Sequence, residues 1–156
     1  LYSAQALEDH KQGLCTYAVE QVVLAIVVTT GIASIFLTKD YTPDYNSGLA
    51  HAIFYALTAY PVIEERHLHG EVVAFGILIA LLVDGQKEAF EKIYELNKSI
   101  GLLARLSDIE ITPAQWEECL ARIPAMSDVA HYPYKVTRPM LEDAMKTLEE
   151  RAVSHR

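Results

Sequence analysis

The chain has 156 residues, of which 51% are hydrophobic and 22% are charged, and its formal net charge at pH 7 is −8. A chain of this length and composition is expected to form one domain with a substantial core. The net negative charge argues against a nucleic-acid partner, because phosphate binding needs clustered lysine and arginine side chains. The cysteines, Cys15 and Cys119, lie far apart and form no disulfide framework, so a reduced, cytoplasmic setting is expected.

The first quarter of the sequence predicts two helical stretches of different character. Residues 3–12 are polar and helix-prone, whereas residues 14–37 are mostly apolar. Within the second stretch, the 17 residues from 21 to 37 carry no charge, which is near the lower limit for a membrane span. Threonine, serine and glycine lower its hydrophobicity. We therefore predict a buried helix, with Gly31 as a candidate break, and no membrane partner.

A loop is predicted next, at residues 39–47, which read KDYTPDYNS. Pro43 prevents a helix there, and Asn46 or Ser47 can cap the helix that follows. Asp40 and Asp44 are interpreted as solvated turn residues, although either could serve as a substitute metal ligand.

The rest of the chain predicts five helices and no strand, which makes the fold all-α. The helices are expected at 48–60, at 70–83, at 87–100, around Trp116 and from Thr137 onward. Pro61 ends the first of them, Gly85 and Gly101 end the next two, and Thr112 with Pro113 opens the fourth. Gly76 lies inside the second of these helices, where it costs roughly 1 kcal/mol relative to alanine. It could permit another helix to approach closely.

Two histidines, His51 and His69, lie near the N-terminal ends of the first two of these helices. Neutral imidazole binds zinc and iron well, so two converging imidazoles would suit a divalent metal. The eight residues from Pro61 to Leu68 can span at most about 26 Å, which is enough to return His69 beside His51. A tight helical hairpin would instead separate them. A lone histidine on an apolar helix is more often a structural residue than a ligand, so each could be structural. In an extended segment His67 would also point the same way as His69.

The motifs around these histidines carry a family resemblance. GLAHAIFYALT at 48–58 and HLHGEVVAFGILIALL at 67–82 together resemble the C-terminal helical domain of the iron-containing alcohol dehydrogenase superfamily. Within it they resemble the glycerol-dehydrogenase-like branch with its hydroxycarboxylate dehydrogenase relatives. The resemblance runs from about Val22 to Leu148. It implies a helical bundle like the C-terminal domain of the dehydroquinate-synthase-like and glycerol-dehydrogenase-like fold, with His51 and His69 as ligands of zinc or iron.

Other positions of the motifs acquire expected roles from the resemblance. Phe54 and Tyr55 stand where many relatives carry a second histidine, and they could line the substrate pocket. Glu71 either stabilises the first turn of its helix through the helix dipole or orients His69 through its second nitrogen. The family's third metal ligand, an aspartate in a GDA-like motif, has no counterpart before His51. His131, in the loop at 124–136, is interpreted as structural.

The sequence also lacks GxGxxG, a Walker loop, CxxC and GxSxG. Residues 1–156 are therefore interpreted as a single helical metal-binding domain and as a fragment, without the N-terminal NAD-binding α/β domain of the family. The resemblance implies an NAD-dependent, metal-containing dehydrogenase acting on a small alcohol, a glycerol-like polyol or a hydroxy acid. NAD(H) would be bound by the missing domain, and a homo-oligomer is a further expectation. The isolated chain is expected to fold but to be inactive.

Two alternatives stay open. LHGEVVAFG also resembles the corresponding motif of dehydroquinate-synthase-like lyases, which need basic residues for a substrate phosphate. Arg66 is the only arginine between Cys15 and Gly101. The other alternative is a non-catalytic helical module in which both histidines are structural.

Overall fold

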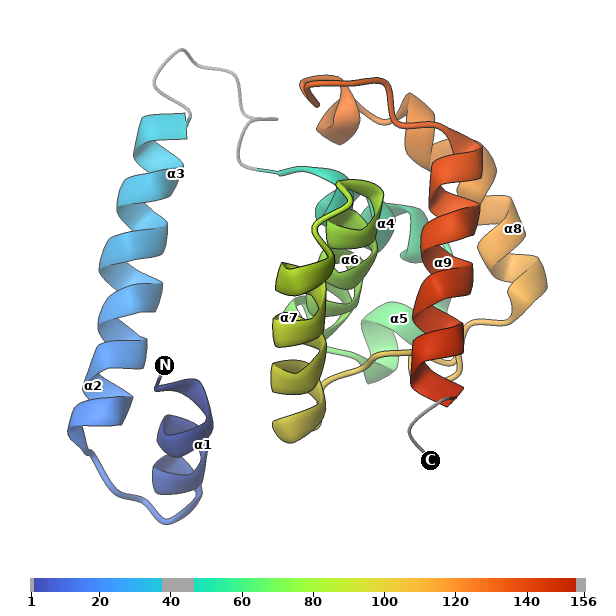
Figure 1. Cartoon of the computed structure of the whole chain (residues 1–156). Coiled ribbons are helices and arrows are strands. Elements are labelled where there is room, and N and C mark those ends of the chain that lie inside the picture. Colours follow the sequence, from blue (N-terminus) through green and yellow to red (C-terminus); the bar gives the residue numbers. More distant parts are fainter. Residues whose placement is uncertain (1, 38–46, 154–156) are drawn as a thin grey trace. The chain divides into compact units, whose positions relative to one another are not determined.

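The computed structural model describes residues 2–37 and 47–153. Within these ranges every regular element is helical and no strand occurs, which confirms the predicted all-α fold (Figure 1). Contacts divide the chain into two compact units, the first ending at Asn46 and the second beginning at Ser47. The prediction of a single domain stays a prediction. Apart from Ser47, the predicted loop at 39–47, with Asp40 and Asp44, lies outside the described residues.

The first unit contains a short helix and a long one. The short helix is α1 (Ser3–Lys11). The long helix consists of three successive parts: α2 (Tyr17–Leu24), the π-helical turn η1 (Ala25–Thr30) and α3 (Gly31–Leu37). Gly31 has helical φ and ψ, so the helix continues through the candidate break.

Within the first unit the long helix is exposed, where a buried helix was predicted. Val27, Ile35 and Phe36 expose 67%, 70% and 69% of their surface. The reason lies in what covers the helix: α1 has nine residues and packs against α2, which leaves η1 and α3 largely bare. By length and composition Tyr17–Phe36 could cross a membrane, with a mean hydropathy of 2.0. The predicted absence of a membrane partner stays a prediction.

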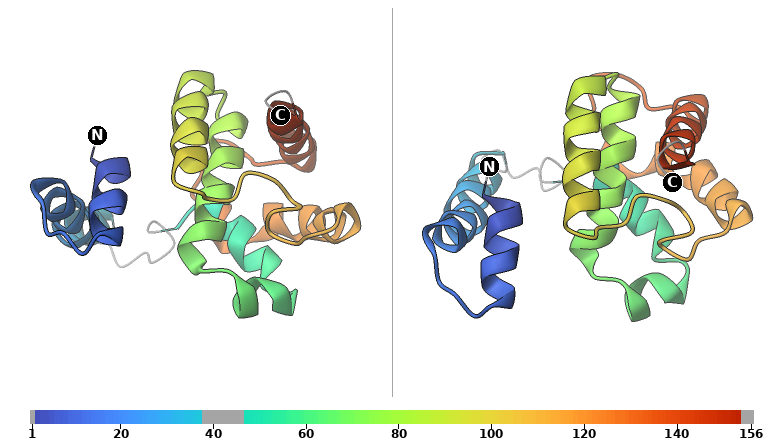
Figure 2. Two further views of the ribbon diagram at one scale, coloured as in Figure 1. Left: turned by 90° about the horizontal axis from the view of Figure 1, so that it is seen from below. Right: turned by 60° about the horizontal axis from the view of Figure 1, so that its bottom comes forward.

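In the second unit, α6 (His69–Val83) lies at the centre. Its sequence is apolar on almost every side, which is typical of a helix surrounded by other helices. It packs against α4 (Leu49–Leu57), α7 (Lys87–Ser99) and α9 (Arg138–Val153). Figure 2 shows α7 and α9 on opposite sides of it. The largest fully buried side chains of this core are Phe75, Leu49, Ile53, Leu57, Ile63, Leu78, Ile79, Ile109, Leu120, Ile123, Leu141 and Leu148.

Most of these helices begin and end at the predicted signals, although α4 has Gly48 rather than Asn46 or Ser47 as its N-cap and ends at Leu57, before Pro61. One connector is an exception. Gly85 and Gly101 have φ of 69° and 78°, the left-handed backbone that favours glycine after a helix. Thr112 forms a capping box at the start of α8 (Pro113–Arg122). The exception is the predicted connector after Tyr60, where residues Pro61–Arg66 form the short helix α5. A proline is tolerated at the first helical position, because the N–H that it lacks would be unpaired there anyway.

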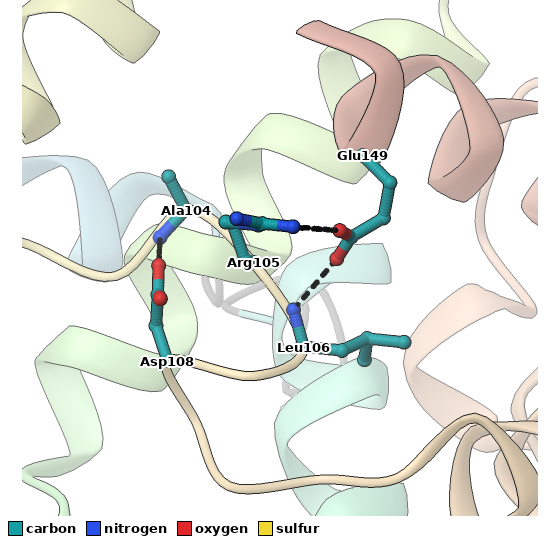
Figure 3. A network of polar contacts seen from close by, with 5 residues as sticks. All are labelled: Ala104, Arg105, Leu106, Asp108 and Glu149. Carbon is teal, nitrogen blue, oxygen red and sulfur yellow. Dashed lines mark hydrogen bonds and ion pairs between the residues drawn. The ribbon is translucent and has the colours of Figure 1, made fainter. Parts of the chain in front are cut away.

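The connector between α7 and α8 is held by the last helix. Glu149 of α9 accepts a hydrogen bond from the backbone N–H of Leu106 at 2.9 Å and forms an ion pair with Arg105 at 3.3 Å (Figure 3). Asp108 accepts a hydrogen bond from the backbone N–H of Ala104 at 3.1 Å. These bonds fix the path of the connector across the second unit.

Candidate metal site

The helices α4 and α6 bring His51 and His69 together. His51 is the third residue of α4, and His69 is the first residue of α6. The two helices approach closely, because Gly76 of α6 leaves no side chain between itself and the backbone of α4. The centroids of the two imidazole rings are 5.6 Å apart, and their planes are inclined by 44°. The convergence that the sequence allowed but did not require is therefore present.

The structure also distinguishes His69 from His67. The Nε2 atom of His67 lies 4.0 Å from the carboxylate of Glu110, and its side chain is only 10% exposed. The side chain of His69 is exposed and makes ring contacts with His51 and Phe54. His69 is therefore the histidine of this pair that lies beside His51.

Two aromatic side chains of α4 border the histidines. The Phe54 and His69 rings are nearly perpendicular, at 81°, with centroids 4.4 Å apart. The Tyr55 ring lies 6.4 Å from His51 and 5.4 Å from Phe54, and Tyr55 is 46% exposed. Both residues that were predicted to line a pocket thus lie beside the histidine pair. Their role toward a substrate stays a prediction.

Glu71 is engaged at the start of α6. Its Oε2 atom accepts a hydrogen bond from the backbone N–H of Leu68 at 2.9 Å. This bond satisfies one of the donors that a helix N-terminus leaves without a partner, and the carboxylate lies at the positive end of the helix dipole. Glu71 therefore fixes the backbone next to His69. Its predicted orientation of the His69 ring stays a prediction.

The electrostatic environment favours the neutral form of His51. Burial lowers the pKa of His51 below its ordinary value of 6.5, and the neighbouring His69 lowers it further. Asp128, in the short helix η4 (Ser127–Val129), opposes both effects. The net result is a neutral imidazole at pH 7, which is the form that binds a metal. Sequence reasoning missed Asp128, because no local signal connects this loop residue with a histidine far earlier in the chain.

The separation of the two rings fits a shared metal ion. If one nitrogen of each ring faced a shared ion with metal–nitrogen bonds of about 2.1 Å, two tetrahedral imidazole ligands would have centroids about 5 Å apart. The observed 5.6 Å is close to this value. Two imidazoles suit zinc or iron. His51 and His69 therefore fit such an ion as two of its ligands.

No third protein ligand lies next to this pair among the residues at 2–37 and 47–153. Among the residues that the structure describes, no group of three His, Cys, Asp or Glu side chains could hold a metal. Asp40 and Asp44, the substitutes considered from the sequence, lie outside those residues. His131 is exposed in its loop. Among the described residues, His51 and His69 thus stay the two predicted ligands.

The fold matches that of a solved dehydrogenase. A probable glycerol dehydrogenase from Sinorhizobium meliloti 1021 superposes with a TM-score of 0.78, over 99% of this chain and 42% of that chain, at 24% sequence identity. This similarity establishes the fold of the chain as that of the C-terminal helical part of a glycerol dehydrogenase. No family model matches the sequence.

Curated relatives are dehydrogenases as well. Hydroxycarboxylate dehydrogenase A of Escherichia coli (strain K12) is 28% identical over 151 residues, which are 94% of this chain and 40% of that protein. Glycerol dehydrogenase of Pseudomonas putida is 32% identical over 124 residues, which are 73% of this chain and 32% of that protein. The chain thus spans about a third to two fifths of the length of these relatives. The resemblance to the glycerol-dehydrogenase-like branch of the iron-containing alcohol dehydrogenase superfamily is confirmed.

Proposed function

We propose that this chain is the C-terminal metal- and substrate-binding part of an NAD-dependent dehydrogenase that acts on a small alcohol, a polyol such as glycerol, or a hydroxy acid. The observation that carries the proposal is the pair of His51 and His69 with ring centroids 5.6 Å apart. The names of the relatives support the substrate class, because they include glycerol and hydroxycarboxylate dehydrogenases.

In this proposal, His51 and His69 hold zinc or iron as neutral imidazoles. The bound metal supplies Lewis acidity toward the substrate oxygen. The lowered pKa of His51 keeps it in the ligating form at neutral pH. Phe54 fixes the His69 ring by edge-to-face contact and excludes water from one side of it. The exposed Tyr55 lies beside the histidine pair, where its hydroxyl can bond to a substrate hydroxyl.

The remaining parts of the reaction are assigned to residues outside this chain. NAD(H) and a third metal ligand would come from the part of the relatives that this chain does not span. We expect the isolated chain to show no hydride transfer for that reason. The lyase alternative needs a basic residue to hold a phosphate, but Arg66 is already paired with Glu110 at 3.0 Å. The relatives are dehydrogenases, which favours the dehydrogenase over the lyase.

A chimera tests the proposal. The N-terminal part of the Pseudomonas putida glycerol dehydrogenase would be joined to this chain, and NADH formation would be followed with glycerol and small hydroxy acids. We expect metal-dependent turnover that is lost in the His51→Ala and His69→Ala variants and kept in His10→Ala, which changes an exposed histidine of α1. Circular dichroism and gel filtration confirm folding of each variant. Turnover that survives both site substitutions, or a folded, metal-loaded chimera that oxidises none of these substrates, would contradict the proposal.

A further inference from the structure

Glu110 has an unusual backbone conformation. Among the described residues it is the one non-glycine residue with a positive φ, at 56°. An L-residue in this region is strained, and it persists there only where the surroundings hold it. Here the neighbours in the chain hold it, because Ile109 and Ile111 are both buried, at 0% and 3% exposure. The left-handed backbone lets both isoleucines enter the core while the Glu110 side chain stays at the surface.

The connector that carries Glu110 is fixed from another side. Glu149 of α9 holds Arg105 and the Leu106 backbone (Figure 3). The backbone N–H of Ile111 donates to the Leu106 carbonyl at 3.0 Å. The Glu110 carboxylate is therefore presented from a backbone whose position α9 and the core determine, rather than from a free loop.

The Glu110 carboxylate reaches the turn that precedes His69. Its Oε2 atom lies 3.0 Å from Nη1 of Arg66, the last residue of α5, and 4.0 Å from Nε2 of His67. That nitrogen of His67 is buried and has no hydrogen-bond partner in the structure, so the carboxylate is its nearby polar group. Glu110 thus lies against Arg66 and His67, which directly precede Leu68 and His69.

The turn between α5 and α6 is held from both ends by carboxylates. Glu110 holds Arg66 and lies beside His67, and Glu71 holds the backbone N–H of Leu68. His69 follows directly as the first residue of α6. Its side chain is exposed, so its place opposite His51 depends on the backbone that presents it rather than on burial of the ring.

We propose that Glu110 is a positioning residue for the metal site, which sets the turn at 66–68 and thereby the position of His69 opposite His51. This inference rests on the proposed function, in that His51 and His69 are taken as metal ligands. An ordinary exposed ion pair contributes little to a structure. Glu110 differs, because the buried Ile109 and Ile111 on either side of it fix the backbone from which its carboxylate meets the turn.

The test compares Zn²⁺ affinity with stability in the full chain. Glu110→Ala removes the carboxylate and keeps the strain, whereas Glu110→Gly removes the carboxylate and relieves the strain. We expect both variants to weaken Zn²⁺ binding by roughly threefold to tenfold. Loss of a residue that bonds directly to a metal ligand typically costs about 10-fold to 100-fold, and Glu110 acts less directly. We also expect Glu110→Gly to be the more stable of the two. If Glu110 acted on stability alone, the Glu110→Gly variant would bind Zn²⁺ with the affinity of the wild type.

Two further variants sharpen the test. Arg66→Ala should weaken Zn²⁺ binding to a similar extent, and the double variant Arg66→Ala/Glu110→Gly should be no weaker than either single variant, because both remove the same contact. Glu65→Ala removes an exposed carboxylate from the neighbouring position of α5 and should leave the affinity unchanged. The visible spectrum of bound Co²⁺ should change in the Glu110 and Arg66 variants and stay the same in the control.

The outcomes separate the inference from the proposed function. Wild-type affinity in both Glu110 variants, with loss of binding in the His51→Ala and His69→Ala variants, overturns the inference and leaves the proposed function standing. Zn²⁺ binding that is independent of both histidines contradicts the proposed function and the inference with it. Equal losses in Glu65→Ala and Glu110→Gly also overturn the inference, because they indicate a general effect of charge.

Discussion

Gly76 of α6 lies directly against the backbone of Ala50 in α4. A Cβ atom on Gly76 would be 2.6 Å from the carbonyl oxygen of Ala50 and 2.9 Å from its Cα atom. Neither atom belongs to a flexible side chain, so neither can move away without moving α4. His51 is the residue after Ala50. The same glycine contact that packs the two helices therefore sets how closely His51 approaches His69.

The substitution Gly76→Ala is expected to destabilise the chain. The added methyl group overpacks the contact, and we expect the free energy of unfolding to fall by about 1 to 3 kcal/mol. This net loss is what remains after the roughly 1 kcal/mol that alanine gains in helix propensity. Urea unfolding followed by circular dichroism measures it.

Gly70→Ala provides the matched control in the same helix. No heavy atom lies within 4 Å of a Cβ at Gly70. Stability should stay the same or rise by up to about 1 kcal/mol. A destabilisation of equal size at both positions would show that the contact with Ala50 is not the cause.

Glu149 is expected to matter for stability because it bonds the connector to α9. It accepts from the Leu106 backbone at 2.9 Å and pairs with Arg105 at 3.3 Å, and its side chain is 30% exposed. Glu149→Ala should lower the free energy of unfolding by about 1.5 to 3 kcal/mol, the range for hydrogen bonds to charged groups. The same substitution at the exposed Glu65 should change it by no more than about 0.5 kcal/mol. Chemical denaturation of both variants measures the two losses. Equal losses in Glu149→Ala and Glu65→Ala would contradict the role of Glu149 in holding the connector to α9.

The hydrogen bond of Tyr60 should make the free energy of unfolding depend on pH in the alkaline range. Its hydroxyl donates to Glu118 at 2.6 Å, and this bond raises the pKa of Tyr60 from 10.0 to about 12, with burial as a smaller cause. Because the folded-state pKa is raised, the contribution of Tyr60 is fully present below pH 10 and is lost as the pH rises toward 12. The difference in unfolding free energy between the wild type and Tyr60→Phe should therefore be constant at neutral pH and shrink above about pH 10. A difference that is the same at about pH 8 and about pH 11.5 would contradict this assignment.

Local features of the fold could be predicted from the sequence because their causes are local. Thr112 with Pro113 opens a helix through the side chain and ring of those two residues, and Gly85 and Gly101 end helices through their own φ angles. Proline at position 61 has two readings, since the same ring that ends one helix can begin the next. The sequence was interpreted as a helix end followed by a connector, and the structure shows that Pro61 begins a new helix instead.

The site was predictable only in part, for a related reason. The two histidines could be found from their motifs, and Gly76 was correctly expected to permit close approach of another helix. The electrostatic effect of Asp128 on His51 and the ion pair of Glu110 with Arg66 join segments that are distant in the sequence, where no spacing rule applies. The exposure of the helix at 17–36 was missed because composition shows that a helix is apolar but not which neighbour covers it.

The fold is expected to persist without metal. The buried core of the second unit consists of apolar side chains, and neither His51 nor His69 belongs to it. A chelator should therefore leave the helical circular dichroism signal and the thermal unfolding midpoint unchanged, unlike in small domains whose folding depends on zinc. Loss of helical signal on chelation would show that a metal holds the fold.

The central claim is that His51 and His69 together bind one metal ion. Its most direct test is Zn²⁺ titration of the chain at about pH 7.5, with the spectrum of bound Co²⁺ as an independent signal. We expect one ion per chain, with affinity weakened by roughly tenfold or more in His51→Ala and in His69→Ala. The affinity should be unchanged in His10→Ala, which changes an exposed histidine of the first unit. Zn²⁺ binding that is undiminished when both His51 and His69 are replaced would contradict the claim.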